Sequence, residues 1–443
     1  MTAMVSEHAR DIPAINPAPM RILFVSYWFP PTNVVGAVRA GKFARYMRDA
    51  GHDLRVLAGP ARDPLGLMLE IPEAAVSRPE VARHEPPTVR FAAAGSKLRE
   101  RSDAWGLTSG RIGKKLREHV YAAREIPDKQ CGWIEPAVVL GRGLTRDWRP
   151  DLIVASAPPY SGLMVAARLS DESGVPWIAE MRDPWSGNVY NDRPIWRDWL
   201  DRRMERRTLG RAAALVAVSP VVARDLGARY KQPIATVLNG FAPEDLPSPS
   251  VRAPHDVLTI VYTGTIYAGH RDPSPLFAAI ARLAAEARRQ VRVVFYGPTD
   301  TQVRALAAPY GIQEQIVVMP AVNYRTSLEH QADADVLLLL QRNHPSDEGN
   351  VPAKFFEYMG ALRPILLLGY EQGVLARMIR ERFAGLISND PAAIAGQLQT
   401  WIAESRAEGV PALAEAARAG LSRAEQFGEY EAFLRARITE QTG

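Results

Sequence analysis

Residues 20–59 read MRILFVSYWFPPTNVVGAVRAGKFARYMRDAGHDLRVLAG. Two apolar runs, Ile22–Ser26 and Leu54–Ala58, enclose a segment with helical spacing of its apolar residues, Val35–Ala50. The runs lack polar alternation, which is typical of parallel strands buried on both faces. This stretch therefore predicts a strand–helix–strand unit, from which doubly wound α/β folds are built.

The same alternation continues along the chain in two series. The first series adds the expected strands Leu152–Ser156, Trp177–Glu180, Ala214–Val218 and Ala235–Leu238. The second contains Leu258–Thr263, Val291–Tyr296, Ile316–Met319, Val336–Leu340, Ile365–Leu368 and Gly385–Ser388. Expected helices between strands include Ser161–Glu172, Ser274–Arg288 and Ala353–Gly360. Segment 242–255 separates the series and is rich in proline without periodicity, which indicates a linker.

We therefore expect an α/β protein with two Rossmann-like domains facing a cleft. The predicted parts are a disordered tail (1–19), an N-terminal domain (20–241) with an insert (60–133), the linker (242–255), a C-terminal domain (256–410) and a C-terminal crossover helix (411–443). A final helix over Pro411–Ile438 is expected to cross back to the N-terminal domain. Within the insert, Val89–Ala93 reads as a strand and Arg111–Glu125 as a basic helix.

Composition narrows the class of protein. The 443 residues include 54 Lys and Arg against 49 Asp and Glu, with 47% apolar residues, which is typical of a globular chain. A single cysteine, Cys131, excludes an internal disulfide and a cysteine-built zinc site. No stretch suits a membrane span, and the first 19 residues lack the apolar core of a signal peptide. A cytoplasmic location is expected.

The sequence lacks the motifs of several enzyme classes. The first strand is not followed by the G-x-G-x-x-G of dinucleotide enzymes, and neither a P-loop nor a G-x-S-x-G elbow occurs. Asp333-Ala334-Asp335 resembles a metal-binding D-x-D pair, but it precedes a strand instead of ending one. We therefore expect no bound metal.

Segment 348–369, EGNVPAKFFEYMGALRPILLLG, is the most informative candidate site. Pro352 suits the start of a helix, and the amides around Asn350 and Val351 would then face an anionic phosphate. Lys354 in the first turn adds a positive charge, and Glu357 lies on the same face, where a carboxylate can bind a vicinal diol such as ribose. An exposed ion pair between Lys354 and Glu357 is the alternative.

These motifs resemble those of the retaining glycosyltransferases of family 4. The opening at 20–59, VAVSPVVARDLGARY followed by VLNGFAPEDL, YTGTIYAGHRDPSPL and KFFEYMGALRPIL occur in the order that the family shows. P-W-I-x-x-x-R-D-P-W at 176–185 resembles a branch that makes surface polysaccharides and other glycoconjugates.

The resemblance implies the two-domain GT-B fold and transfer of a hexosyl-type sugar, with retention, from a UDP- or GDP-linked donor to a saccharide or lipid-linked acceptor. No cofactor is implied. Lys354, Arg271 and Asp183 are the catalytic candidates, and Glu357 should bind the donor. Many relatives carry a second glutamate eight positions earlier, where this chain has Gly349. Glu348 stands one residue away and is a substitute if the loop shifts. Asn350, Val351 and Thr265 complete the donor-side candidates.

The acceptor is expected on the N-terminal domain, at Gly36, Arg39, Arg182 and Trp185. Each has a structural alternative: Arg39 as a solvated helix residue, Arg182 and Asp183 as partners that hold their loop, and Trp185 as a loop anchor. Arg271 follows a strand of the second domain in GHRDP and is expected to neutralise the donor diphosphate, with a surface arginine as the alternative.

Two basic segments, Arg111–Glu125 and Arg193–Arg211, suggest contact with an anionic membrane surface, so the location is expected to be cytoplasmic and peripheral. Ordinary surface helices are the alternative. Nucleic acid is not expected, because no aromatic platform or reading helix is present. Two rival functions stay open: a sugar-nucleotide epimerase of similar fold, and a sugar-nucleotide-binding protein without catalysis.

Overall fold

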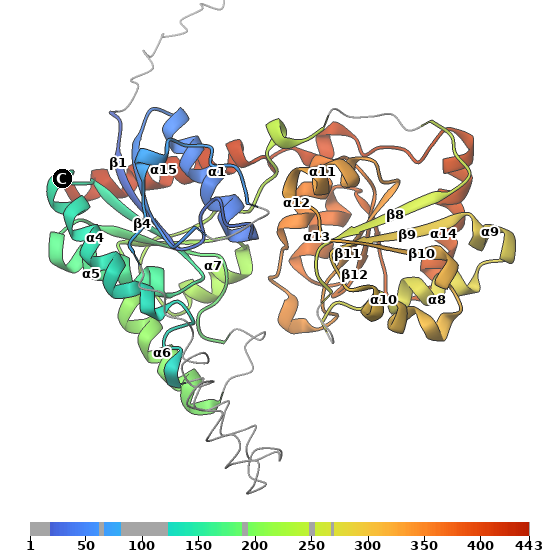
Figure 1. Cartoon of the computed structure of the whole chain (residues 1–443), viewed down its shortest axis with the longest axis horizontal. Coiled ribbons are helices and arrows are strands. Elements are labelled where there is room, and N and C mark those ends of the chain that lie inside the picture. The colour runs from blue at the N-terminus through green and yellow to red at the C-terminus, as the bar shows by residue number, and fades with distance from the viewer. Residues whose placement is uncertain are drawn as a thin grey trace, which may run out of the picture.

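Two parallel sheets, each covered by helices, form two domains that lie side by side (Figure 1). This computed structural model describes residues 18–61, 66–80, 123–187, 194–247, 253–266 and 270–442. The prediction of two Rossmann-like domains is confirmed.

The N-terminal sheet has the strand order β3-β2-β1-β4-β5-β6-β7, and every printed pair is parallel. Its strands are β1 (Arg21–Ser26), β2 (Asp53–Ala58), β3 (Val76–Ser77), β4 (Leu152–Ala157), β5 (Trp177–Met181), β6 (Ala214–Ala217) and β7 (Ile234–Thr236). Its helices are α1 (Val35–Asp49), α4 (Ile134–Asp147), α5 (Ser161–Ser173), α6 (Ile195–Leu209), α7 (Pro220–Gly227) and, from the end of the chain, α15 (Arg423–Thr442).

The C-terminal sheet has the order β10-β9-β8-β11-β12-β13, again parallel. Its strands are β8 (Leu258–Thr263), β9 (Val291–Tyr296), β10 (Ile316–Met319), β11 (Val336–Leu340), β12 (Ile365–Leu368) and β13 (Gly385–Ile387). Its helices are α8 (Ser274–Arg282), α9 (Ala285–Arg289), α10 (Asp300–Ala307), α11 (Tyr324–Ala332), α12 (Ala353–Gly360), α13 (Val374–Glu381) and α14 (Pro391–Ala407).

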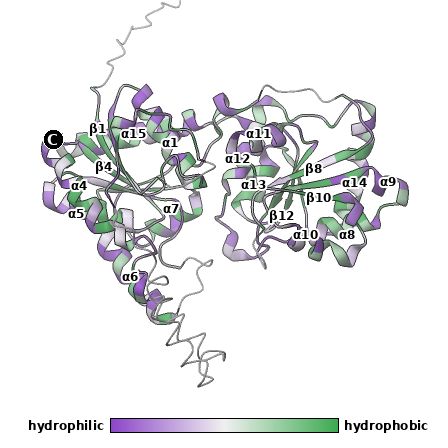
Figure 2. Cartoon of the chain, viewed as in Figure 1, coloured by the Kyte–Doolittle hydropathy of each residue, from purple (hydrophilic) through white to green (hydrophobic). Residues whose placement is uncertain are grey.

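Successive residues of each strand point to opposite faces of the sheet and so belong to two cores, one on each face. On β1, Phe24 joins the core under α1 and α15, whereas Leu23 and Val25 join the core under α4 and α5. Figure 2 shows the apolar strands inside both domains. Helix α15 belongs to the first of these cores, because Phe427 and Tyr430 pack on Phe43 at ring distances of 5.6 and 4.9 Å. The predicted crossing of the last helix back to the N-terminal domain is confirmed (Figure 1).

Two predicted helices differ from the structure. The helix expected over Ser274–Arg288 is interrupted after Arg282, because Leu283 adopts an extended backbone while its side chain is buried. The final helix begins at Arg423 and not at Pro411. Gly420 has φ +75°, a left-handed conformation that a helix cannot continue through, and only a short 3-10 turn precedes it at Glu415–Arg418.

Parts of the insert lie outside the described residues. These include the expected strand Val89–Ala93 and all but the last three residues of the expected helix Arg111–Glu125. Within the described part, residues 66–80 supply β3 at the sheet edge. Among all the residues that the structure describes, no helix has the length and apolar character needed to cross a bilayer.

The topology selects one edge of each sheet for ligand binding. The strand order reverses between β1 and β4 in one domain and between β8 and β11 in the other. Ligands of doubly wound sheets bind outside the carboxyl ends of the strands at such points. The loops after β1, β5, β8 and β11 carry the residues that the sequence singles out.

Candidate functional site

Lys354 lies in the first turn of α12, whose amino end has no side-chain cap. Its Nζ is 4.5 Å from the ring centre of Tyr262 and 3.5 Å from the Tyr262 hydroxyl. Gly264, after β8, has φ +118°, and a Cβ there would collide with Nζ. The glycine therefore leaves room for the ammonium group at the carboxyl end of β8.

A second cation approaches Lys354 from the loop after β8. Arg271 donates from Nη1 to the carbonyl oxygen of Thr265 at 3.0 Å. Burial lowers the pKa of Lys354 to about 7; the charge of Arg271 lowers it too, and the carboxylate of Glu357 opposes both effects. Two neighbouring cations repel each other, and an anion bound between them would offset this repulsion. The structure thus brings together the two cations predicted to bind a diphosphate.

Glu357 lies three residues further along α12 and is held by an amide. Its Oε2 accepts a hydrogen bond of 3.1 Å from Nε2 of Gln331, which is fully buried and also donates to Thr263 Oγ1 at 3.1 Å. Burial raises the pKa of Glu357, while the Gln331 hydrogen bond and the charges of Arg423 and Lys354 lower it. The fixed, largely enclosed carboxylate does not fit the alternative of an exposed ion pair.

Arg423, the first residue of α15, was missed by the sequence analysis. It is only 5% exposed, and its backbone packs on Gly240 of the N-terminal domain. Its charge lowers the pKa of both Glu357 and Tyr324, which places the guanidinium beside them. Among the described residues, no hydrogen-bond partner is present for its Nε and Nη1 atoms. This guanidinium therefore has donors to offer a ligand beside Glu357.

The loop before α12 is fixed by Gln341, at the end of β11. Its Nε2 donates to the backbone oxygens of Asp347 and Asn350, at 3.1 and 2.9 Å. The Asn350 amide donates to the Asp347 oxygen at 3.0 Å, so it is not free for a phosphate, contrary to the prediction. The Val351 side chain is buried in the core, which leaves only its backbone for a ligand. The backbone amides that remain as candidates for binding an anion are those of the uncapped first turn of α12.

Glu348 and Gly349 face the N-terminal domain. Oε1 of Glu348 lies 3.5 Å from Nη1 of Arg224 on α7. A Cβ at Gly349 would lie 2.6 Å from the Cβ of Val221, also on α7. A glutamate at position 349 would therefore not fit in this conformation. The idea that Glu348 replaces it is not favoured, because its carboxylate engages Arg224.

Gly36 and Arg182 lie against each other on the N-terminal side. Gly36 is in the first turn of α1, and a Cβ there would collide with the Arg182 guanidinium. Arg182 donates to the backbone oxygen of Pro158, and its Nε has no partner among the described residues. The start of α1 has no side-chain cap. A cation and a helix start thus meet at the carboxyl ends of β1 and β5.

Asp183 follows Arg182 and is exposed. The surrounding protein removes part of its hydration and raises the pKa of the carboxyl, and the charge of Arg182 opposes this rise. The carboxylate is available to a substrate hydroxyl on the N-terminal side.

Two acceptor-side predictions are wrong. Arg39 is 2% exposed and donates from Nη2 to Glu180 Oε1 at 2.8 Å and from Nη1 to the Leu238 oxygen at 2.8 Å. Its guanidinium joins α1 to β5 and to the segment that leaves the domain, so it is not available to an acceptor. Trp185 is also buried and stacks on Tyr160 at 5.0 Å, so it anchors its loop instead of stacking on a sugar.

Asp335 of the D-x-D pair stabilises the fold. Its Oδ2 accepts from the Thr259 amide at 2.7 Å and lies 2.8 Å from Nε2 of His255, at the amino end of β8. This edge is opposite to the ligand edge. Within the described ranges, no group of three His, Cys, Asp or Glu residues is arranged to hold a metal.

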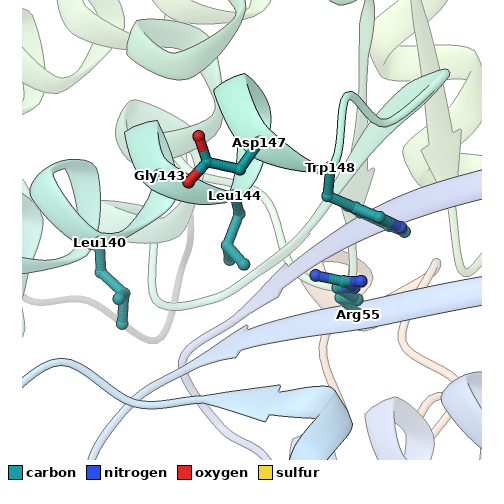
Figure 3. A pocket seen from close by; sticks show the side chains of 6 residues that line it. All are labelled: Arg55, Leu140, Gly143, Leu144, Asp147 and Trp148. Carbon is teal, nitrogen blue, oxygen red and sulfur yellow. The ribbon is translucent and has the colours of Figure 1, made fainter.

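Two hollows of the surface lie outside the Lys354 site. The one drawn in Figure 3 has a volume of about 300 Å³ and is lined by Arg55, Leu140, Gly143, Leu144, Asp147 and Trp148. It lies between α4 and the early part of β2, where Arg55 stacks on Trp148 at 4.6 Å, away from the ligand edge. A second, of about 260 Å³, lies beside Asp183, and its lining includes Pro184, Ser186, Arg202, Asp225 and Arg229.

Residues 36–240 match the glycosyl transferase 4-like domain. No curated protein matches the chain by sequence. The sucrose-phosphate synthase of Thermosynechococcus elongatus has a similar structure, with a TM-score of 0.64 at 12% identity over 96% of this chain and 100% of that one. A glycosyltransferase of Rickettsia africae gives 0.61 at 12% over 95% and 99%. Anabaena HepE, solved in complex with UDP-glucose, gives 0.58 at 14% over 94% and 99%.

The GT-B arrangement predicted from the sequence is confirmed by these likenesses, which at such low identity establish the fold alone. The match to the glycosyl transferase 4-like domain supports a glycosyltransferase. It covers most of the N-terminal domain, whereas Lys354, Arg271 and Glu357 lie in the other domain. The donor-side assignments therefore depend on the geometry described above.

Proposed function

We propose that the protein transfers a hexosyl-type sugar, with retention, from a UDP- or GDP-linked donor to an acceptor hydroxyl in the synthesis of a surface polysaccharide or glycoconjugate. The observation that carries this proposal is the grouping of Lys354 and Arg271 beside Glu357 at the carboxyl end of β8. Two cations suit the diphosphate, and a fixed carboxylate suits the ribose hydroxyls. Arg423 adds guanidinium donors beside the same carboxylate.

In the proposed reaction the bond between the anomeric carbon and the donor's phosphate oxygen breaks, and the diphosphate leaves with the electron pair. Lys354, Arg271 and the uncapped start of α12 stabilise the negative charge that develops there. The acceptor oxygen attacks from the same face, and its proton passes to the departing phosphate oxygen. No nucleophile of the protein is required.

On the acceptor side, Asp183 orients a hydroxyl, and Arg182 with the start of α1 binds an anionic group. The contact of Gly349 with Val221 sits where the donor loop meets the N-terminal domain. Because Gly349 has no side chain, the donor loop can lie close to α7. The donor-binding and acceptor-binding sides of the two domains can then close on each other and exclude water from the donor. We further propose that no divalent metal and no cofactor take part.

The test starts with the purified protein and a panel of nucleotide sugars in a thermal-shift assay, because a ligand of the folded state raises the melting temperature. The stabilising donor is then incubated with candidate acceptors, and the anomeric configuration of the product is read by NMR. A product with inverted configuration would contradict the mechanism. Epimerised donor without transfer would favour the epimerase, and binding without hydrolysis or transfer would favour a non-catalytic binding protein.

A further inference from the structure

Helix α6 buries charges and exposes apolar residues. Arg197, Asp201 and Glu205 are 1–2% exposed and face the protein. Arg197 donates from Nε to Asp201 Oδ1 at 2.9 Å, while Glu205 accepts from the Ser186 amide at 2.7 Å and from the Tyr230 hydroxyl at 2.9 Å. The packed side of the helix predicted within Arg193–Arg211 thus carries charged residues and not an apolar stripe. The inward face of α6 finds its partners within the protein.

The outward face carries aromatic and aliphatic side chains next to cations. Ile195 is 90% exposed, Trp199 64% and Trp196 38%. Four exposed arginines follow them along the helix: Arg202, Arg203, Arg206 and Arg207. Spacings of three and four residues keep 195, 199, 202 and 206 on one line of the helix surface. Figure 2 shows apolar and polar residues together on α6, at the periphery of the N-terminal domain.

Exposed tryptophans beside arginines are not explained by the stability of the fold. Large apolar side chains in water cost free energy, and a group of them marks an interaction site. Among the described residues, Asp198 is the acid on this side of the helix; it accepts from Arg202 Nε at 2.9 Å and leaves the other three arginines in excess. The partner should therefore be apolar and negatively charged at once.

We propose that this face of α6 docks the protein on an anionic lipid bilayer. Tryptophan is favoured at the boundary between headgroups and acyl chains, and arginine binds anionic headgroups. A helix with both on one side lies in the plane of the interface. Charge complementarity selects this partner over a neutral surface. The proposal goes beyond the proposed function, which soluble substrates would satisfy.

The buried face of α6 contacts the loop that carries Asp183, on the acceptor side. Glu205 holds the amide of Ser186, three residues after Asp183, and pairs with Arg229 of the neighbouring segment. Arg202 lines the hollow of about 260 Å³ beside the Asp183 loop. A bilayer under α6 would therefore bring headgroups to the mouth of the acceptor side.

The test is flotation of the full chain with vesicles of phosphatidylcholine alone or with 30% phosphatidylglycerol. Binding is expected only to the anionic vesicles, with release at high salt because the charges are screened. Arg203→Gln with Arg207→Gln should weaken binding roughly thirtyfold, as expected for the loss of two cations at an anionic surface. Ile195→Ser with Trp199→Ser should weaken it about tenfold or more.

The matched control is Arg377→Gln with Arg380→Gln, which removes two exposed arginines from α13 of the other domain and should not change binding. Donor-induced thermal shifts should be equal in all variants, so that failure of docking is distinguishable from failure of the donor site. Absence of binding by the wild type, or an unchanged serine variant, would overturn the proposal. A wild-type dimer in sedimentation that the serine variant abolishes would overturn it as well and assign the face to self-association.

Discussion

Donor affinity should fall as the pH rises above 7, because of Lys354. In the free protein its pKa is about 7, lowered first by burial and then by Arg271. A bound diphosphate favours the charged ammonium and so raises this pKa. Above pH 7, binding must therefore take up a proton, whereas below it the ammonium is already charged.

The size of the effect follows from this linkage. Each pH unit above the free pKa costs about 1.4 kcal/mol of binding free energy, a factor of about ten, until the pKa of the complex is reached. Between pH 7 and 9 the Kd of a nucleotide sugar should rise up to roughly fiftyfold, because about half of the Lys354 side chains are already neutral at pH 7. A nucleotide sugar is the better probe than a free nucleotide, because its diphosphate lacks the terminal phosphate that ionises near pH 6.

Isothermal titration calorimetry at several pH values measures both Kd and, in buffers of different ionisation enthalpy, the number of protons taken up. Lys354→Arg is the matched control, because a guanidinium keeps its charge over this range. Its profile should be flat. A flat wild-type profile, or an equally steep one in the arginine variant, would refute the assignment of the titrating group to Lys354.

Three further outcomes are expected. Glu357→Gln should keep the fold but weaken donor binding by about 1.5–3 kcal/mol in calorimetry, since a charged hydrogen bond is lost; an unchanged Kd would remove Glu357 from the donor site. Gly349→Ala should lower turnover by separating the donor loop from α7, and Val221→Ala in the same chain should restore it; no recovery would argue against this contact. Turnover should be the same with and without EDTA, and a loss reversed by magnesium or manganese would contradict the metal-independent mechanism.

The strands and most helices could be predicted because buried parallel strands leave uninterrupted apolar runs. The α12 start was predicted within one residue, since proline before a helix is a local signal. The break after Arg282 was not, because it depends on where the buried side chain of Leu283 finds space in the tertiary structure. Local patterns carry no information on such packing.

The candidate site also contains residues that local sequence indicates and residues that depend on tertiary packing. Lys354, Arg271 and Glu357 lie on segments that follow strands at the ligand edge, and this position together with the resemblance to family 4 selected them as candidates. Arg39 has an equally suitable position on α1, but the partner that removes it from the site, Glu180, is 141 residues away. Arg423 was missed for the reverse reason, because only the path of the last helix brings it next to Glu357.

The return of α15 has a consequence for the order in which the protein is completed during synthesis. Phe427 and Tyr430 fill the core around Phe43, so the first domain lacks part of its interior until α15 has left the ribosome. The second sheet, β8 to β13, and its helices are synthesised in one continuous stretch before that. The N-terminal domain is therefore completed only after the second domain has been synthesised, and nascent chains expose an apolar groove under α1 for a chaperone to cover. For the same reason, a fragment that ends in the linker would carry this groove permanently.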